Sequence, residues 1–359
     1  MTTMHVVSAP GKLVLVGEYA VLEGAPAISA AVNIFAVATL QSVAATTSEL
    51  RIANCGSRYG FSVAPGGTIE WLADPADLGA LLVAALEALA ARGLLKQSLP
   101  PFSLELCSRN FFNNAKEGPA QKIGVGSSAA IVVALTSALQ SYLGHDPAFE
   151  VCLDAHRRFQ KGKGSGVDVA TSWFGGVIAM QPKGGDAPLI EKLTWPQGLT
   201  VAPVWTGESA STTLMLQRLE QFKSQPGNNY QKIMQRLVEA SQDTCKNWQT
   251  GAADDVIASL DEYGGILHEL DSAAGIGIWS PCHQRLDSVA RKAGVSYKPS
   301  GAGGGDFGLA FSRDAARLQD FLSEVNAKLI PQPDKLGWAD RGLIINGAAI
   351  SDETAGYSK

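Results

Sequence analysis

The sequence predicts an α+β fold of about two domains. Short segments rich in β-branched residues predict strands, helical patterns occur between and after them, and both halves of the chain contain both kinds of element. This mixture favours an α+β fold over an all-parallel Rossmann sheet. The chain has 359 residues, 46% of them hydrophobic, so it can bury a large core.

Strands are predicted where β-branched residues dominate the N-terminal half. Residues 4–16 are partly alternating, and residues 28–40 are rich in Val, Ile and Phe. A short alternating segment at 102–107 predicts a further strand. Residues 167–180 mix apolar and small side chains, and we expect this segment to include a strand.

In the same half of the chain, residues typical of helix starts and helix ends predict three helices. A helix is predicted over 76–91, because Asp74 and Pro75 open it and Gly93 ends it. A Gly/Ser turn precedes the next helical pattern. Two further helices are predicted at 129–143 and 147–160.

Helical patterns dominate the C-terminal half. Residues 182–188 (P-K-G-G-D-A-P) form the clearest linker-like stretch, so we expect one domain over 1–190 and a second over 191–359. A Gly-rich loop at 299–306 precedes an apolar strand at 307–311. Helices are predicted at 212–222, 230–248, 252–270 and 281–292.

Composition argues against several classes of function. The net charge is -5 and the pI about 5.6, which gives no support for binding nucleic acid or an anionic membrane. The five cysteines are scattered and form no C-x-x-C, as expected of reduced thiols in the cytosol, and the histidines lack metal-ligand spacing. No signal peptide or apolar span of about 20 residues is evident. We expect a soluble cytoplasmic protein, either a monomer or a homodimer.

Lys12, in S-A-P-G-K-L (8–13), is the first candidate for chemistry. A lone lysine after Pro-Gly is usually a solvated turn residue. Here it lies in an apolar strand, next to Gly11 and before Gly17, where it should be partly desolvated and need an anionic partner. A phosphate or a carboxylate would serve.

The segment 122–130 (K-I-G-V-G-S-S-A-A) leads into a helix. Glycines let a backbone approach a ligand closely, and a helix N-terminus presents free N–H groups and partial positive charge. One serine could simply cap the helix. Two serines and two glycines exceed what capping needs, which favours a phosphate cradle with one serine hydroxyl on Mg²⁺. The chain contains no Walker sequence G-x-x-x-x-G-K-[ST].

Asp168 lies between apolar residues in G-S-G-V-D-V-A (164–170). Taken alone, the segment is typical of an Asx-turn or a helix cap. Next to a lysine, a carboxylate in an apolar frame would instead form a charge pair available for catalysis.

The segment 298–308 (K-P-S-G-A-G-G-G-D-F-G) has four glycines among five residues, which is costly in chain entropy. A flexible loop is the ordinary interpretation. Because Lys298-Pro299 and a core strand frame the glycines tightly, we expect close backbone contact with a ligand or with a neighbouring loop.

In combination and in order, these segments resemble the motifs of the GHMP kinases. The first is similar to that family's first motif, the second to its phosphate-binding motif and the fourth to its C-terminal glycine-rich motif. The matches span most of the chain. Four stretches are most similar to the phosphomevalonate kinase branch: A-P-G-K-L-V-L-V-G-E-Y-A-V-L-E-G at 9–24, G-S-G-V-D-V-A at 164–170, T-G-E-S-A-S-T at 206–212 and K-P-S-G-A-G-G-G-D at 298–306.

The resemblance implies a fold and a set of site residues. The fold is an N-terminal domain of the ribosomal protein S5 domain 2 type plus a C-terminal ferredoxin-like domain, with the active site between them. Lys12 and Asp168 match the catalytic pair. The ATP-binding residues would be Lys122, Gly124, Val125, Gly126, Ser127, Ser128 and Ala129, with Ser127 or Ser128 near Mg²⁺. The acceptor would lie near Lys12, Tyr19, Ser165, Gly166, Ser211, Ser300, Gly301, Ala302 and Gly303.

Two positions depart from the family pattern. Mevalonate kinases carry a glutamate as a second metal ligand eleven residues before the catalytic aspartate, and here that position is Arg157, with Gln160 nearby. This departure weighs against mevalonate kinase itself. Glu208, in T-G-E-S-A-S-T, is an acid close to the expected place of an anionic acceptor, and no physical reason for it is evident.

The resemblance further implies ATP-dependent phosphorylation of 5-phosphomevalonate, with ATP and Mg²⁺ as cofactors. A phosphate monoester has a second pKa of about 6, so this acceptor is largely ionised and needs no general base. Lys12 would bridge the donor and acceptor phosphates, and Asp168 would orient Lys12. The cations that could gather these anions, each alternatively an ordinary solvated charge, are Lys122, Lys161, Lys163, Lys298, Arg157 and Arg158.

Two alternatives stay open. The first is a GHMP kinase that acts on a hydroxyl of mevalonate, of a mevalonate phosphate or of a sugar. The second is a non-catalytic nucleotide or metabolite sensor with the same fold. Lys12, Ser127, Ser128 and Asp168 argue against the sensor, because a sensor need not keep the machinery of phosphoryl transfer.

Overall fold

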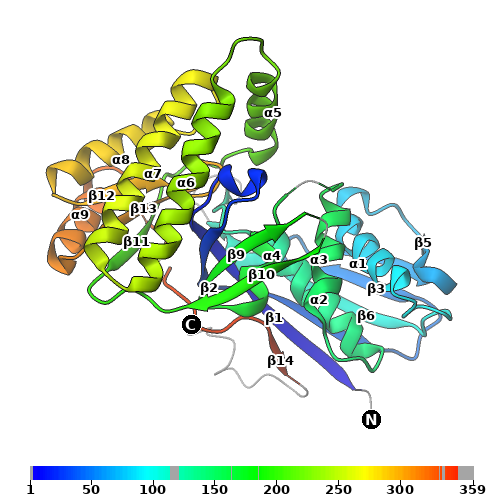
Figure 1. Ribbon diagram of the computed structural model, residues 1–359. Helices are drawn as coiled ribbons and strands as arrows, with labels where there is room; N and C mark the ends of the chain where they lie inside the picture. The colour runs from blue at the N-terminus through cyan, green and yellow to red at the C-terminus, as the bar shows by residue number, and fades with distance from the viewer. Residues whose placement is uncertain are drawn as a thin grey trace.

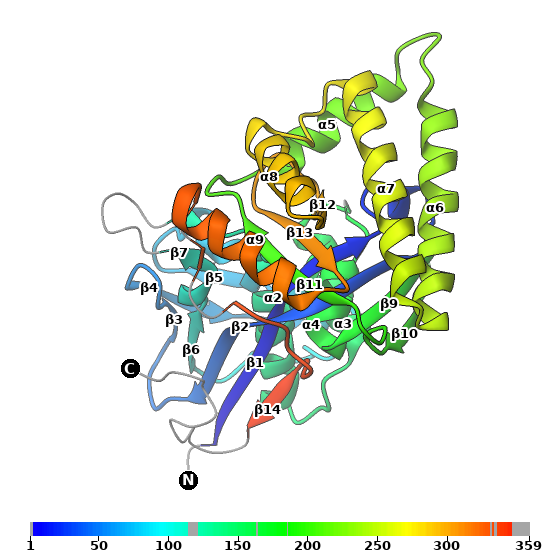
Figure 2. The same ribbon diagram turned by 90° about the vertical axis from the view of Figure 1, so that its left-hand side faces the viewer.

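The computed structural model describes residues 3–113, 121–162, 164–184, 186–330, 332–333 and 336–346. Two lobes lie against each other, and each has a sheet with helices packed on it (Figure 1; Figure 2). Strands and helices occur in both lobes, so the α+β prediction is confirmed. Within the described ranges, none of the helices has both the length and the apolar character needed to cross a membrane.

A large sheet forms the first lobe. Its strands are β1 (Met4–Val16), β2 (Ala27–Ser42), β3 (Ser48–Ile52), β4 (Ser57–Val63), β5 (Ile69–Trp71), β6 (Phe102–Cys107), β9 (Val177–Lys183), β10 (Asp186–Leu193) and β14 (Ile344–Asn346). They run in the order β10-β9-β2-β6-β3-β4-β5, and β1 pairs with β2 and with β14. The β3–β6 pair is parallel, and the other pairs are antiparallel.

Helices cover this sheet, and the central ones support the site. They are α1 (Ala80–Ala91), α2 (Ser127–Tyr142), α3 (Phe149–Phe159) and α4 (Val167–Phe174). Both α2 and α4 pack on β1 and β2, while α3 packs against α1, α2 and α4. Because α2 carries small and apolar residues on nearly every side, it is buried along most of its length.

The short elements of the first lobe connect these layers. They are the 3₁₀ helices η1 (Ala20–Glu23), η2 (Pro65–Gly67), η3 (Ala76–Gly79) and η4 (Arg109–Phe111), and the two-residue strands β7 (Phe112–Asn113) and β8 (Gln121–Lys122). The predicted helix over 76–91 therefore begins as the 3₁₀ turn η3 and continues as α1.

The second lobe has a three-stranded antiparallel sheet in the order β11-β13-β12. Its strands are β11 (Thr200–Trp205), β12 (Ser296–Pro299) and β13 (Phe307–Ser312). Its helices are α5 (Thr212–Lys223), α6 (Tyr230–Thr250), α7 (Ala253–Ala274), α8 (Pro281–Lys292) and α9 (Ala315–Lys328). Helices α7 and α8 pack on β12, and α9 packs on β11 and β13.

Strand β1 is buried on both faces, and it joins the two cores. Val7 and Ala9 belong to the core under the first sheet, whereas Leu13 and Leu15 belong to a core that continues into the second lobe. Alternate side chains of a strand point to opposite faces, so a strand in this position must be apolar on both. A side chain placed on β1 therefore has a fixed position relative to both lobes.

The segment 167–180 includes a strand as predicted, because β9 begins at Val177. Its first part is the helix α4, which the pattern did not predict. Gly166, in the left-handed region at φ +82°, precedes α4 and lets the chain turn into it. The linker-like stretch at 182–188 contains the ends of β9 and β10, which pair with Asp186 opposite Lys183.

The predicted domain boundary at 190–191 therefore falls within β10 and stays a prediction. The chain crosses from one sheet to the other over 194–199, and β14 brings it back to the first sheet. The other segments predicted as strands or helices form those elements, with ends that differ by a few residues. The patterns did not predict the short strands β3, β4, β5, β11, β12 and β14, or the helix α9.

Candidate active site

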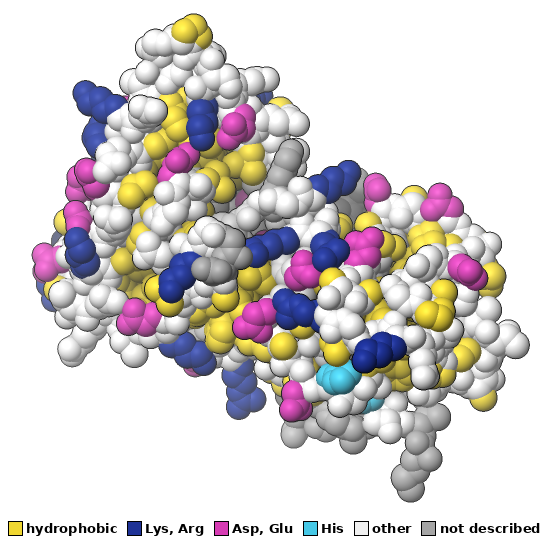
Figure 3. Space-filling view, turned by 45° about the vertical axis from the view of Figure 1, so that its right-hand side comes forward, with side chains coloured by type: hydrophobic (Ala, Val, Ile, Leu, Met, Phe, Trp, Pro, Cys, Tyr) yellow, Lys and Arg dark blue, Asp and Glu magenta, His cyan; other side chains and the backbone are white. Residues whose placement is uncertain are grey.

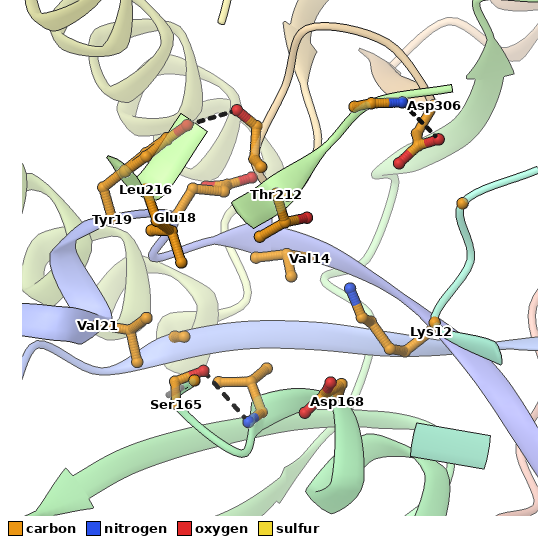
Figure 4. Close-up of a pocket in the computed structure, with 18 of the residues that line it drawn as sticks. Lys12, Val14, Glu18, Tyr19, Val21, Ser165, Asp168, Thr212, Leu216 and Asp306 are labelled. Carbon is orange, nitrogen blue, oxygen red and sulfur yellow. Dashed lines mark hydrogen bonds between the residues drawn. The ribbon is translucent and has the colours of Figure 1, made fainter. Parts of the chain in front are cut away.

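A cavity of about 320 Å³ opens between the two lobes. Figure 4 shows side chains from β1, α4, α5 and the loop before β13 arranged around one space. In the space-filling view, Lys and Arg side chains alternate with Asp and Glu near the junction of the lobes (Figure 3). The cavity lining itself is also mixed in charge, with Lys12 and Lys122 beside Glu18, Asp168 and Asp306.

Lys12 enters the cavity from β1 and lies along the loop at 124–128. Its backbone N–H donates to the carbonyl of Val125 at 2.8 Å. Gly11 makes this approach possible, because a Cβ there would lie 2.5 Å from that same carbonyl oxygen. A Cβ on Gly126 would lie 3.1 Å from Lys12 Cε, so the lysine side chain runs directly over this glycine.

The loop at 124–128 presents the start of α2 to the cavity. Gly124 and Gly126 both have positive φ, at +83° and +80°, and Gly126 is the residue from which α2 begins. Neither serine caps this helix, so the capping interpretation of the two serines is wrong. Ser128 lines the cavity, while Ser127 is buried. The uncapped N–H groups are available to an anion.

Asp168 reaches the cavity from the first turn of α4. Its Oδ1 accepts a hydrogen bond from the backbone N–H of Val169 at 2.9 Å, and its side chain is 22% exposed. Lys12 and Asp168 approach the same space from different elements (Figure 4). The predicted meeting of these two residues with the start of α2 is thus present in the fold.

Asp306 is a third charged group at the site, to which the sequence assigned no role. A Cβ on Gly124 would lie 2.1 Å from Asp306 Cγ, so the carboxylate packs directly against the loop at 124–128. It accepts a hydrogen bond from the N–H of Ala210 at 3.3 Å. Burial raises the pKa of Asp306, and Ala210, Lys12 and Lys122 act in the opposite direction.

Lys122 stands at the edge of the cavity and connects the lobes. Burial of its ammonium lowers its pKa, Asp306 raises it and the positive charge of Lys12 lowers it again. The carbonyl of Lys122 accepts a hydrogen bond from the Ser209 hydroxyl at 2.8 Å. This places the T-G-E-S-A-S-T segment, and with it Ser209 and Thr212, on the cavity wall.

Lys298 does not face the cavity as a free cation. Its side chain and that of Glu18 are each 1% exposed, and the two form an ion pair at 2.5 Å. The Tyr263 hydroxyl donates to the Glu18 carbonyl at 2.6 Å. Burial lowers the pKa of Lys298, and the Glu18 carboxylate raises it. This buried pair connects the end of β1 to β12.

Further hydrogen bonds hold the glycine-rich loop at 300–305 against β1. The Tyr19 hydroxyl donates to the carbonyl of Ala302 at 2.6 Å, and the Ser300 hydroxyl donates to the carbonyl of Val14 at 2.8 Å. Burial raises the pKa of Tyr19, which keeps its hydroxyl protonated as the donor. Gly301 and Ala302 line the cavity.

The fold thus brings most of the predicted site residues to the cavity. Those that line it are Lys12, Tyr19, Lys122, Gly124, Gly126, Ser128, Ser165, Asp168, Gly301 and Ala302. Others are engaged by the protein: Val125, Ser127 and Ala129 are buried, Ser300 bonds to Val14, and Ser211 caps α5. A Cβ on Gly166 would meet Leu153 at 2.6 Å, and one on Gly303 would meet Ile278 at 2.6 Å. The ligand roles proposed for all these residues stay predictions.

Comparison with known proteins decides the family. A protein named phosphomevalonate kinase, from Streptomyces sp. (strain CL190), is 30% identical over 355 residues, covering 87% of this chain and 92% of the relative. A family model for the GHMP kinases N terminal domain matches residues 80–176. The chain belongs to the GHMP kinase family. It is an enzyme, a phosphotransferase, so the sensor alternative is not supported.

Solved structures confirm the GHMP kinase fold. The Lin0012 protein from Listeria innocua is 25% identical with a TM-score of 0.81, covering 96% of this chain and 100% of that one. Streptococcus pneumoniae phosphomevalonate kinase in complex with phosphomevalonate and AMPPNP is 21% identical with a TM-score of 0.72, covering 93% and 99%. The sequence comparison also finds a relative named mevalonate kinase, from Methanothermobacter thermautotrophicus. It is 30% identical over 175 residues, which cover 48% of this chain and 48% of the relative.

Of the two residues at the departure from the family pattern, Gln160 reaches the cavity, while Arg157 is half-buried and is not part of the cavity lining. A Cβ on Gly164 would lie 2.2 Å from Gln160 Oε1. Among the other cations considered, Arg158 pairs with Asp154 at 3.2 Å, Lys161 is exposed, and Lys163 lies outside the described residues.

The sequence patterns of this kinase did not identify Asp306 as a residue of the site. They also did not show that Lys298 forms a buried ion pair with Glu18. The signal for Asp306 was present, because an acid directly follows three glycines. Nothing local in the sequence indicates that Lys298 pairs with a residue 280 positions away.

Proposed function

We propose that the protein transfers the γ-phosphoryl group of ATP to the phosphate of 5-phosphomevalonate and forms 5-diphosphomevalonate. One observation carries the proposal: Lys12, the uncapped start of α2 and Asp168 all face a single cavity between the lobes. Phosphoryl transfer depends mainly on positioning and electrostatic stabilisation, and these groups can provide both.

The donor side of the reaction uses the loop at 124–128. Its glycines take positive φ and open α2 with no serine cap, so the N–H groups at the start of α2 are available to phosphate oxygens. Lys12, which runs over Gly126, places its ammonium beside the same phosphates. Lys122 adds a second positive charge at the cavity edge.

The acceptor side lies toward the glycine-rich loop, Tyr19 and Thr212. A phosphate acceptor is already ionised at neutral pH, so its attack requires no proton removal. Lys12 would then neutralise the charge that gathers between the two phosphates, and Asp168 would hold the Lys12 ammonium in place. Two relatives, from Streptomyces and Saccharolobus solfataricus, are named phosphomevalonate kinase, which supports this acceptor.

Mg²⁺ fits the oxygen groups of this cavity. This cation typically takes one or two protein oxygens together with substrate phosphates and water. Ser128 and the Asp168 carboxylate would hold it, and Gln160 supplies a further oxygen where Arg157 replaces the glutamate of mevalonate kinases. The ion would supply charge neutralisation of the nucleotide phosphates.

A hydroxyl acceptor is the second candidate. The match to relatives named mevalonate kinase favours it, and Asp168 would then have to accept the hydroxyl proton. Arg157 in the place of a metal-binding glutamate disfavours mevalonate itself.

An acceptor panel tests the proposal. The purified protein is incubated with ATP, Mg²⁺ and either phosphomevalonate, mevalonate or a simple sugar, and ADP release is followed. We expect kcat/KM for phosphomevalonate to exceed that for mevalonate by at least about 100-fold. Mevalonate has no phosphate, so the groups that would bind the acceptor phosphate are left without a partner. Lys12→Met is the control for contaminating kinases. Faster turnover of mevalonate than of phosphomevalonate would overturn the proposal.

A further inference from the structure

His156 is a buried histidine directly behind Asp168. It lies on α3 and is 1% exposed, and its Nε2 is 3.7 Å from Asp168 Oδ2. Within the described part of the chain, this Nε2 has no hydrogen-bond partner. A buried polar nitrogen without a partner is costly, so its position beside a site carboxylate needs an explanation.

A second buried histidine shows what a purely structural role looks like here. His283, on α8, is 0% exposed, and both of its ring nitrogens have partners: Tyr297 at 2.8 Å and the carbonyl of Gly305 at 3.1 Å. Burial lowers the pKa of His283 to about 4, so it is a neutral ring with complete hydrogen bonding. His156 differs because its Nε2 has no hydrogen-bond partner among the described residues and lies 3.7 Å from a carboxylate that lines the cavity.

The separation of His156 and Asp168 suits a contact that closes when substrates bind. At 3.7 Å the two atoms are beyond hydrogen-bond range, and a movement of about 0.7 Å would bring them to the usual distance. Hydrogen bonds of catalytic groups are often long in ligand-free structures and shorten in the complex. Asp168 is partly exposed and can move, whereas His156 is enclosed by the core.

We propose that His156 is a positioning residue for Asp168: with both substrates bound, its Nε2–H donates to Oδ2 and fixes the plane of the carboxylate. Oδ1 already accepts from the N–H of Val169, so each carboxylate oxygen would then have one donor from the protein. Asp168 fixed in this way directs the Lys12 ammonium at the phosphates. This inference rests on the proposed function, in which Asp168 orients Lys12 and removes no proton.

Three substitutions of His156 separate positioning from packing. The amide nitrogen of Gln reaches about the place of Nε2, that of Asn reaches about the place of Nδ1, and Leu has no donor. We expect His156→Gln to retain kcat within about 5-fold, whereas His156→Asn and His156→Leu lose about 10- to 100-fold, with both KM values nearly unchanged. The matched packing control is Val151→Ala, a buried α3 position away from the cavity, which should lower the melting temperature and leave kcat unchanged.

A double-variant cycle with Asp168→Asn gives the second readout. If His156 acts through Asp168, adding His156→Asn to Asp168→Asn should cost little more, because both changes remove the same interaction. Equal losses in the Gln and Asn variants, or losses that add fully to that of Asp168→Asn, would overturn the inference. If His156→Leu fails to fold, the Gln and Asn pair still decides.

The same measurements stay informative if the acceptor proves to be different. An enzyme that phosphorylates mevalonate and not phosphomevalonate would contradict the proposed function. The His156 series would then be measured with mevalonate, and the contrast between Gln and Asn would still support or overturn the positioning role.

Discussion

The two glycine-rich loops of this kinase have similar composition and different uses. In the loop at 124–128, Gly124 and Gly126 take positive φ and open α2 with no side-chain cap, so N–H groups stay available to a ligand. In the loop at 300–305, the glycines lack side chains, so neighbouring segments of the protein pack directly against the loop backbone. A Cβ on Gly303 would lie 2.7 Å from the Ile278 carbonyl oxygen, and one on Gly305 would lie 2.9 Å from that of Glu208.

A glycine-rich loop therefore indicates that some group packs closely against its backbone, but the glycines alone do not show whether that group is a ligand or protein. The first loop leaves the N–H groups at the start of α2 without a side-chain cap, and the lysine that accompanies it, Lys12, faces the cavity. The second loop is held by the protein, and its lysine, Lys298, is buried in an ion pair with Glu18. We therefore expect substitutions around the first loop to affect chemistry and those around the second to affect stability.

Lys12→Met should have the largest effect. The substitution keeps the length of the side chain and removes the charge that stabilises the transferring phosphoryl group, so kcat should fall by about 10³- to 10⁵-fold. Single-turnover measurement of ADP formation, with nucleotide affinity measured separately, would check this. A loss smaller than tenfold would show that Lys12 is not part of the transfer machinery.

Glu18→Gln tests the anchoring of the second loop. The change leaves Lys298 buried without its charged partner, so the free energy of unfolding should fall by about 3–5 kcal/mol. Denaturant unfolding would measure it. The double variant Glu18→Gln/Lys298→Met removes both charges and should recover much of this loss. A double variant less stable than Glu18→Gln would contradict the expected cause.

Asp168→Asn should cost about 10- to 100-fold in kcat with a phosphate acceptor, less than the removal of a general base usually costs. The amide can still accept a hydrogen bond, but it no longer attracts the Lys12 ammonium. Single-turnover rates with saturating ATP would show the effect. An inactive variant that still binds nucleotide would indicate that Asp168 removes a proton.

Gly126→Ala and Gly303→Ala compare the two loops directly, because their φ angles are nearly equal, at +80° and +77°. Both should lose about 1–2 kcal/mol from the strained backbone, and Gly303→Ala should lose more, because its Cβ would lie 2.7 Å from the Ile278 carbonyl oxygen. Only Gly126→Ala should also lower kcat, by about tenfold, because the new methyl group pushes Lys12 aside. Melting temperatures and kcat for both variants would test this. An equal loss of kcat in the two variants would show that the two loops do not differ in their effect on catalysis.

The sequence predicted the parts of the site that depend on local signals. Lys12 interrupts an apolar strand, and glycines and serines precede α2, so each could be recognised from its neighbours. The segment V-D-V-A-T-S-W-F was not recognised as the helix α4, since its β-branched residues favour a strand and packing on β1 and β2 overrides them. The short strand β4, S-R-Y-G-F-S-V, was missed although Tyr59, Phe61 and Val63 alternate with small or polar residues.

Contacts between distant segments could not be predicted in this way. His156 and Asp168 lie on different helices, and Glu18 and Lys298 come from different lobes. Ser211 and Ser300 have the residue type expected of ligand contacts, yet their hydroxyls bond to the protein itself. Whether a polar group is free for a ligand depends on tertiary structure that a motif does not contain.

The ³¹P NMR spectrum of the product formed from ATP and phosphomevalonate tests directly whether this kinase phosphorylates the acceptor phosphate. Transfer to the acceptor phosphate predicts two mutually coupled phosphorus signals in addition to those of ATP and ADP, and the absence of this extra pair in a parallel reaction with Lys12→Met. A second uncoupled monoester signal in place of the coupled pair would show that a hydroxyl had been phosphorylated, and would contradict the account.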